Sequence, residues 1–132
     1  MDFKNNKAIY LQIAERICDE ILLNKYNEEE RIPSVREYAS IVEVNFNTVM
    51  RSFEYLQSSE IIFNKRGIGY FVSAGAKANI LSMRKTHFLQ HEIIDVFKQM
   101  QLLHIPMEEV AAMYNQYVKQ QQTNELWELP RK

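Results

Sequence analysis

The chain has 132 residues, 46% of them hydrophobic and 25% charged, which is the balance of a folded globular protein rather than a disordered one. A single cysteine, Cys18, excludes an internal disulfide framework, and no apolar run reaches the roughly 18 residues that a membrane span needs. Because the first residues also lack the apolar run of a signal peptide, we expect a cytoplasmic protein without a membrane partner.

The net charge of −1 does not by itself indicate a nucleic-acid partner. Residues 1–75 carry nine lysines and arginines against eleven acidic residues, a net of −2, and residues 76–132 carry seven against six, a net of +1. Affinity for nucleic acid comes from cations that face phosphates. Any DNA-binding function must therefore depend on where the cations lie in the fold.

Two helices are predicted at the start of the chain. From residue 8 to residue 23, isoleucines recur every four residues and form the apolar stripe of an amphipathic helix. Residues 24–31 form a polar, acidic loop that is most simply solvated. A second helix then runs to about Ile41, with Ser34 as its N-cap and Glu37 at the third position of a capping box.

A third helix and a hairpin follow. The third helix is predicted over about residues 47–58, with Asn45 or Asn47 as its cap. Two short helices joined by a few residues are the helix-turn-helix arrangement. The β-prone runs 61–63 and 70–72 flank a basic turn and predict a hairpin. Three helices followed by a hairpin with a basic tip form a winged helix.

The small residues 73–76 are the candidate domain boundary, which gives a winged helix-turn-helix domain in residues 1–75 and a helical unit in residues 76–132. Apolar positions keep a helical spacing over 80–100, and Pro106 begins another helix. The fold class is thus mostly α with a small β-hairpin, ending in a two-helix unit. Such a pair cannot bury its apolar surface alone, so we expect a homodimer. The dimerisation residues would be Ile80, Phe88, Ile93, Phe97, Met100, Val110, Tyr114 and Tyr117.

Four blocks of the first half resemble the GntR family of bacterial regulators, and specifically its short YtrA-type branch. The blocks are IYLQIA (9–14), IPSVREYA (32–39), VNFNTV (44–49) and KRGIGYFV (65–72). They occur in the order and at the spacing of the family. The resemblance implies a bacterial transcription factor that binds operator DNA as a homodimer and represses its own operon, with transporter genes as a suggested target. It also implies that the C-terminal helices serve dimerisation.

This chain departs from the family pattern at several places. The family commonly has glycine at positions held here by Asn24 or Lys25, by Glu29, and by Ser59 or Glu60. These changes are expected to affect loop geometry rather than DNA contact. The serine–arginine pair of many members is Asn45-Phe46 here, an asparagine-containing version like that of the YtrA-type branch, which leaves no arginine contact at position 46.

The residues expected to contact DNA lie at three places. Arg36 can reach a phosphate or a guanine edge, although a surface ion pair with Glu37 or Glu43 is the simpler role. At the start of the third helix, asparagine can bind adenine, threonine can contact a phosphate or a thymine methyl group, and arginine can bind guanine or a phosphate. One of the asparagines can instead serve only as the helix cap. A basic hairpin tip suits the minor groove, or is simply solvated. The set is Ser34, Arg36, Asn45, Asn47, Thr48, Arg51, Lys65, Arg66 and Gly67.

Four of these residues are cations, so a dimer would bring about eight positive charges near phosphates. That number predicts that DNA affinity falls on the order of a thousandfold between low and moderate salt. Phe46 would sit in an exposed turn, where it packs locally or contacts a sugar or thymine methyl. Ser34 can cap its helix and also donate to a phosphate.

Other functions have weaker support. His87 and His91 stand four residues apart, but no third ligand is fixed by the sequence, so we expect no metal and no cofactor. The apolar residues of 80–100 could line an effector pocket, although a dimer core explains them more simply. No nucleophile–base pair, carboxylate dyad or phosphate-binding glycine loop indicates an enzyme. The main alternative is a winged-helix protein-interaction module without DNA binding.

Overall fold

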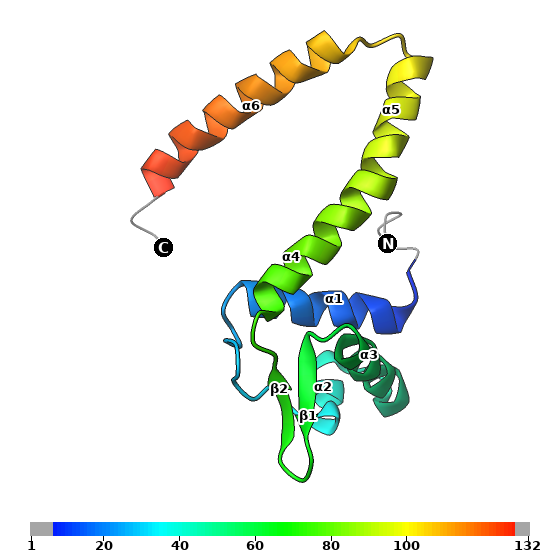
Figure 1. Ribbon diagram of the computed structural model, residues 1–132, viewed down its shortest axis with the longest axis vertical. Helices are drawn as coiled ribbons and strands as arrows, with labels where there is room; N and C mark the ends of the chain where they lie inside the picture. The colour runs from blue at the N-terminus through cyan, green and yellow to red at the C-terminus, as the bar shows by residue number, and fades with distance from the viewer. Residues whose placement is uncertain (1–6, 129–132) are drawn as a thin grey trace. The chain divides into compact units, whose positions relative to one another are not determined.

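The computed structural model describes residues 7–128, with side chains as far as residue 123. Its elements are α1 (Ile9–Leu22), α2 (Val35–Val42), α3 (Phe46–Ser58), β1 (Ile62–Lys65), β2 (Gly69–Val72), α4 (Ala76–His87), the π-helical turn η1 (Phe88–Glu92), α5 (Ile93–Leu102) and α6 (Met107–Glu128) (Figure 1). This mostly helical chain with one hairpin confirms the expected winged helix-turn-helix class. The ends of the expected domains, residues 1–6 and 129–132, lie outside the described part. The chain forms two compact units that divide between Lys85 and Thr86.

Local sequence signals set where the helices of the first unit begin. The Ser34 hydroxyl oxygen accepts a hydrogen bond from the Glu37 N–H at 3.0 Å, and the Glu37 carboxylate accepts one from the Ser34 N–H at 2.8 Å. This is the predicted capping box. Asn45 caps α3, because its side-chain oxygen accepts from the Asn47 N–H at 2.8 Å. The helix therefore begins at Phe46, one residue earlier than expected.

The core of the first unit joins α1, α2, α3 and the hairpin. Its largest fully buried side chains include Ile17, Ile21, Tyr38, Phe53, Leu56, Ile61 and Ile62. The rings of Tyr38 and Phe53 meet edge to face with centroids 6.2 Å apart, and the Tyr38 hydroxyl donates to Glu20 at 3.0 Å. Cys18 is buried in this core, and burial raises the pKa of its thiol to about 11.

The hairpin projects from the helices so that its turn protrudes from the unit (Figure 1). β1 and β2 pair antiparallel, with Lys65 opposite Gly69 next to the turn. Gly67 lies in the turn at a φ of 78°, a left-handed conformation that glycine adopts without steric cost. Arg31 forms an isolated bridge with Phe71, so the segment before α2 runs beside β2.

The start of α4 belongs to the first unit, which extends past the boundary expected at residue 75. Ala76 and Ile80 are buried in its core, and Ile80 is only 1% exposed. Glu28 is exposed, as expected of a solvated loop, and it also accepts hydrogen bonds from the N–H groups of Gly75 at 2.9 Å and Lys77 at 3.2 Å. These bonds lower the pKa of the Glu28 carboxyl, with Gly75 the larger cause. The loop after α1 thus caps α4.

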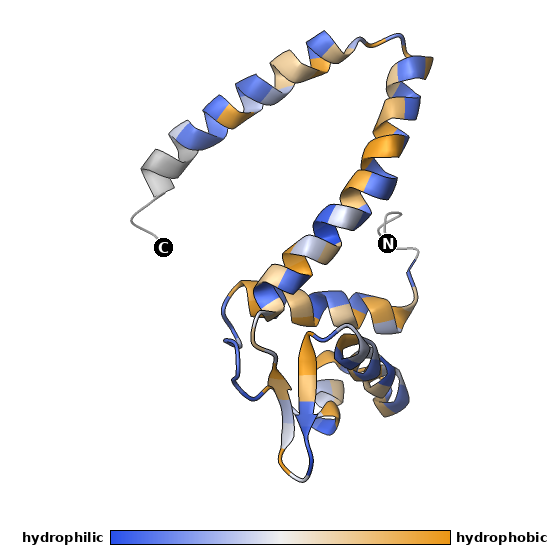
Figure 2. Cartoon of the chain, in the orientation of Figure 1, coloured by the Kyte–Doolittle hydropathy of each residue, from blue (hydrophilic) through white to orange (hydrophobic). Residues whose placement is uncertain are grey.

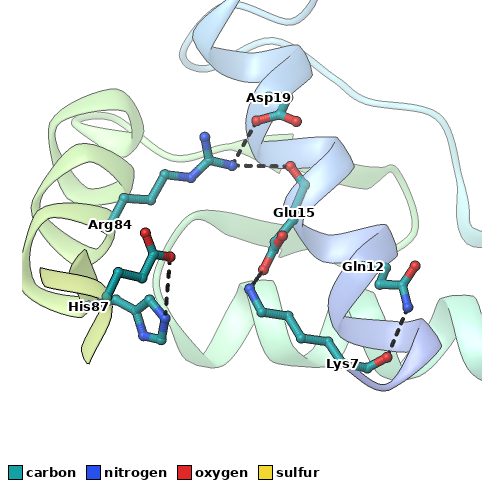
Figure 3. Close-up of polar contacts among 7 residues, drawn as sticks. Lys7, Gln12, Glu15, Asp19, Arg84 and His87 are labelled. Carbon is teal, nitrogen blue, oxygen red and sulfur yellow. Dashed lines mark hydrogen bonds and ion pairs between the residues drawn. The ribbon is translucent and has the colours of Figure 1, made fainter. Parts of the chain in front are cut away.

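A second set of contacts fixes α4 to α1 within the same unit. Arg84 lies 2.8 Å from the Asp19 carboxylate and donates to the backbone carbonyl of Glu15 at 3.3 Å (Figure 3). The side chain of Glu15 pairs with Lys7 at the start of α1. Groups eight to 69 residues apart in sequence therefore meet along this face.

The second unit contains η1, α5 and α6. The break expected around Pro106 is confirmed: α5 ends at Leu102, and His104 has a φ of 57° before α6 begins at Met107. Figure 2 shows hydrophobic residues recurring between hydrophilic ones along α5 and α6. Among the described residues, no helix combines the length and the apolar character that crossing a membrane requires.

Three residues other than glycine adopt a left-handed backbone conformation at positions where the family resemblance leads us to expect glycine. Asn24 has a φ of 66°, Glu29 a φ of 69° and Glu60 a φ of 60°. Such a conformation crowds the Cβ atom against the backbone in every residue except glycine. The turns are therefore formed here by residues that adopt them at a cost.

Candidate nucleic-acid interface

The residues predicted to contact DNA come from α2, α3 and the hairpin, all within the first unit. Arg36, Asn45, Asn47 and Arg51 are exposed at the helix-turn-helix, and Ser34 and Thr48 are half-buried there. Lys65, Arg66 and Gly67 are exposed at the hairpin turn. A helix-turn-helix presents the first residues of its second helix to the major groove, and here that helix is α3.

Two of these residues have structural roles that the sequence analysis offered as alternatives. The Ser34 and Asn45 side-chain oxygens are both engaged in helix caps. The Asn45 amide group and the Ser34 hydroxyl hydrogen are donors that the caps do not use. Asn47 and Thr48, in the first turn of α3, cap nothing.

Arg36 does not form the ion pair with Glu37 or Glu43 that was the simpler interpretation. Within the described residues it has no ion pair at all, and its guanidinium carbon lies 5.6 Å from the centroid of the Phe46 ring. Phe46 is 41% exposed at the first position of α3. A cation and an exposed aromatic ring thus stand together where α3 begins.

Arg51 lies over the ring of Tyr10, with its guanidinium carbon 3.9 Å from the ring centroid. The two residues border an open pocket of about 380 Å³ between the first turns of α1 and α3, lined by Ala8, Ile9, Tyr10, Asn47, Thr48 and Arg51. Three members of the predicted DNA-contacting set therefore share one concave surface. Sequence reasoning missed Tyr10, because only the packing of α1 on α3 brings it there.

The hairpin turn can approach a ligand closely. A Cβ atom added at Gly67 would meet no atom within 4 Å, so the space above the turn is open. At Gly69, with a φ of 144°, an added Cβ would lie 2.9 Å from Arg31 Nε. Glycine at position 69 thus lets the Arg31 guanidinium lie against the hairpin. Arg31 is a cation that was not predicted to belong to the site, because it comes from the loop before α2.

The residues predicted for dimerisation divide between the units. Phe88, Phe97, Tyr114 and Tyr117 are exposed, and Ile93, Met100 and Val110 are half-buried. Ile80 stands apart, because the core of the first unit buries it. The rings of His87 and His91 lie 4.8 Å apart. A carboxylate oxygen of Glu92 lies 4.0 Å from His87 Nε2 (Figure 3). The described residues contain no group of three or more metal-ligating side chains.

The sequence of this chain is similar to those of known bacterial regulators. The model of a family described as bacterial regulatory proteins, gntR family, matches residues 9–72. The HTH-type transcriptional regulator YhcF of Bacillus subtilis is 35% identical over 109 residues, which are 82% of this chain and 88% of YhcF. The HTH-type transcriptional repressor YtrA of the same organism is 30% identical over 118 residues, covering 85% and 91% of the two chains.

A solved structure shows the same similarity in three dimensions. The crystal structure of a GntR-family transcriptional regulator from Bacteroides thetaiotaomicron has 58% sequence identity and a TM-score of 0.78, covering 86% of this chain and 99% of that one. The chain therefore belongs to the GntR family, as a DNA-binding transcriptional regulator of the YtrA type.

Proposed function

We propose that this protein is a cytoplasmic repressor that binds a palindromic operator as a homodimer and controls a transporter operon, without enzymatic activity. The observation that carries the proposal is the N-terminal half of α3, where the exposed Asn47 and Arg51 and the half-buried Thr48 border one pocket. Repression agrees with the name of its relative YtrA, a transcriptional repressor. The transporter operon is what the family resemblance suggests.

In the proposed complex, α3 enters the major groove. Asn45 and Asn47 offer amide groups to adenine, and Thr48 offers its hydroxyl to a phosphate or its methyl group to thymine. Arg36 and Arg51 contact the flanking strand backbone. The hairpin turn, with Lys65, Arg66 and Gly67, lies on the adjacent minor groove, where basic side chains and a close backbone suit the narrow, negative surface.

The homodimer is supported by the apolar surface of the second unit. Phe97 is exposed on α5, and Tyr114 on α6 is 65% exposed, far more than a large aromatic residue in a protein core. Pairing with a second copy would cover such side chains. A two-fold dimer would present two α3 helices to half-sites one helical turn apart, about 34–36 Å, and would thus require a palindromic operator.

The DNA-binding proposal is tested by selecting duplexes from a random pool and measuring their affinity in a mobility-shift assay. Arg36→Ala and Arg51→Ala should each weaken binding of the dimer about a hundredfold, because each substitution removes two charge-assisted phosphate contacts that contribute about tenfold apiece. Arg16→Ala is the matched control, because Arg16 pairs with Glu20 on α1 and should leave affinity unchanged. Binding unaffected by both test variants would refute the proposed mode. No salt-sensitive binding to any duplex would favour the protein-interaction module.

The dimer is tested by the mass of the protein in solution. Phe97→Glu should shift the chain from dimer to monomer at micromolar concentration, because a carboxylate would be buried without a partner. Gln99→Glu adds the same charge on α5 two positions away and should leave the dimer intact. A protein that is monomeric before any substitution would refute this part of the proposal alone.

A further inference from the structure

Three of the four cations predicted to face DNA lie over aromatic rings. The distances from the cationic group to the ring centroid are 3.9 Å for Arg51 over Tyr10, 4.6 Å for Lys65 over Phe71 and 5.6 Å for Arg36 over Phe46. All fall within the range in which a ring attracts a cation. None of the three cations has a carboxylate partner within the described residues.

Cations elsewhere in the first unit are arranged differently. Arg84 pairs with Asp19, and Arg16 and Lys25 both pair with Glu20, although these two also lie near rings. A carboxylate neutralises the cation that it orients, whereas an aromatic ring carries no net charge. A cation held by a ring therefore keeps its full charge for a phosphate. This difference lets residues 1–75, whose net charge is −2, present a positive surface to DNA.

Two contacts with α3 fix Tyr10. Its backbone carbonyl accepts a hydrogen bond from the hydroxyl of Ser52 at 2.6 Å, and Ser52 is fully buried. Its ring meets Tyr55 edge to face with centroids 6.3 Å apart. Ser52 and Tyr55 follow Arg51 on α3, so the helix that carries the cation also fixes the ring beneath it.

We propose that Tyr10 is a positioning residue that holds Arg51 ready for a phosphate of the DNA backbone. The proposal rests on the DNA-binding function proposed above. A guanidinium donates its hydrogen bonds in its own plane, so stacking on a ring leaves those donors free. The Arg51 side chain lies against Tyr10 of α1, and Arg51 is more than one helical turn from the Asn45 cap. It therefore faces the strand backbone beside the groove rather than the base edges.

The test replaces the ring and follows the affinity for two duplexes, the selected operator and an unrelated sequence. Tyr10→Leu should weaken binding to both by the same factor, about four- to twentyfold for the two copies of a dimer, because a phosphate contact carries no sequence information. Tyr10→Phe keeps the ring and should bind like the parent protein. The thermal midpoint of each variant shows that it is folded, and Tyr10→Met replaces Tyr10→Leu if that variant unfolds.

The deciding measurement is the double-mutant cycle with Arg51→Ala. If Tyr10 acts through Arg51, Tyr10→Leu should cost less than about 1.5-fold once the arginine is absent. An equal loss in both backgrounds would overturn the proposal, because the ring would then act without the cation. A loss confined to the operator would also overturn it, because Arg51 would be reading a base. A parent protein that binds neither duplex refutes the proposed function itself, which is a different outcome.

Discussion

The end of α3 gives a prediction that needs no ligand. Helix α3 ends in a Schellman motif: the N–H of Ile61 donates to the Leu56 carbonyl at 2.9 Å, and the N–H of Glu60 donates to the Gln57 carbonyl at 3.0 Å. The motif requires a left-handed residue after the cap, and Glu60 supplies it with a φ of 60°. We predict that Glu60→Gly stabilises the protein.

The magnitude follows from two opposing effects. Left-handed backbone costs a residue with a Cβ atom about 1–2 kcal/mol, which glycine avoids. Glycine also raises the conformational entropy of the unfolded chain, which takes back about 0.4–1 kcal/mol. The Glu60 side chain is exposed and forms no ion pair within the described residues, so nothing else is lost. The net gain is about 0.5–1 kcal/mol, or about 3–6 °C in Tm.

The assay is thermal unfolding followed by circular dichroism, with Ser59→Gly as the matched control. Ser59 precedes Glu60 and has a φ of −87°, so glycine relieves no strain there. That variant should lose about 0.5–1 kcal/mol of stability. If Glu60→Gly lowers Tm as Ser59→Gly does, the strain assigned to this turn is absent and the reasoning fails.

Four further outcomes follow from the structure. Ser34→Ala removes half of the capping box and should reduce the free energy of unfolding by about 1 kcal/mol in urea titration; an unchanged midpoint would mean that α2 does not need its cap. The folded-state pKa of Glu28 lies below its ordinary 4.5, so its contribution to stability is present above pH 4.5 and is lost as pH falls through the folded pKa. Glu28→Gln should therefore make Tm fall less steeply between pH 5 and pH 3, and parallel curves would contradict this. The Cys18 thiol should resist a thiol reagent at pH 8 until urea unfolds the core, because burial hinders access and raises the thiol pKa to about 11. Eight cations at phosphates give a slope of log affinity against log salt of about −7, and a slope shallower than about −4 would show that half of them do not contact DNA.

Much of the interface could be predicted because it depends on local signals. The Ser34 capping box, the Asn45 cap and the hairpin turn each involve residues within a few positions of one another. Whether such a segment forms a cap or a turn therefore depends on the hydrogen bonds and backbone preferences of its own side chains. The exposed positions on α3 follow from the helical period once its start is known.

Other features of the interface were beyond sequence reasoning. For Arg36, which we expected at the DNA, the simpler alternative was an ion pair with a neighbouring glutamate, but its guanidinium instead lies over Phe46. The glutamates and Phe46 are all close to Arg36 in the sequence. Only the angle at which α2 packs on α3 decides that the guanidinium contacts Phe46. Arg31 comes from a loop read as acidic, and it reaches the hairpin because the chain there pairs with Phe71.

The sequence by itself determined the order of elements, the helix caps and the basic hairpin turn, because each arises from interactions along a short stretch of chain. The tertiary structure decided what holds the cations and where the first unit ends. Tyr10 and Ser52 are joined across 42 residues, and Glu28 and Gly75 across 47. Such contacts form only when distant helices pack. The positive surface that we assign to DNA binding is thus a product of packing, since residues 1–75 as a whole carry a net charge of −2.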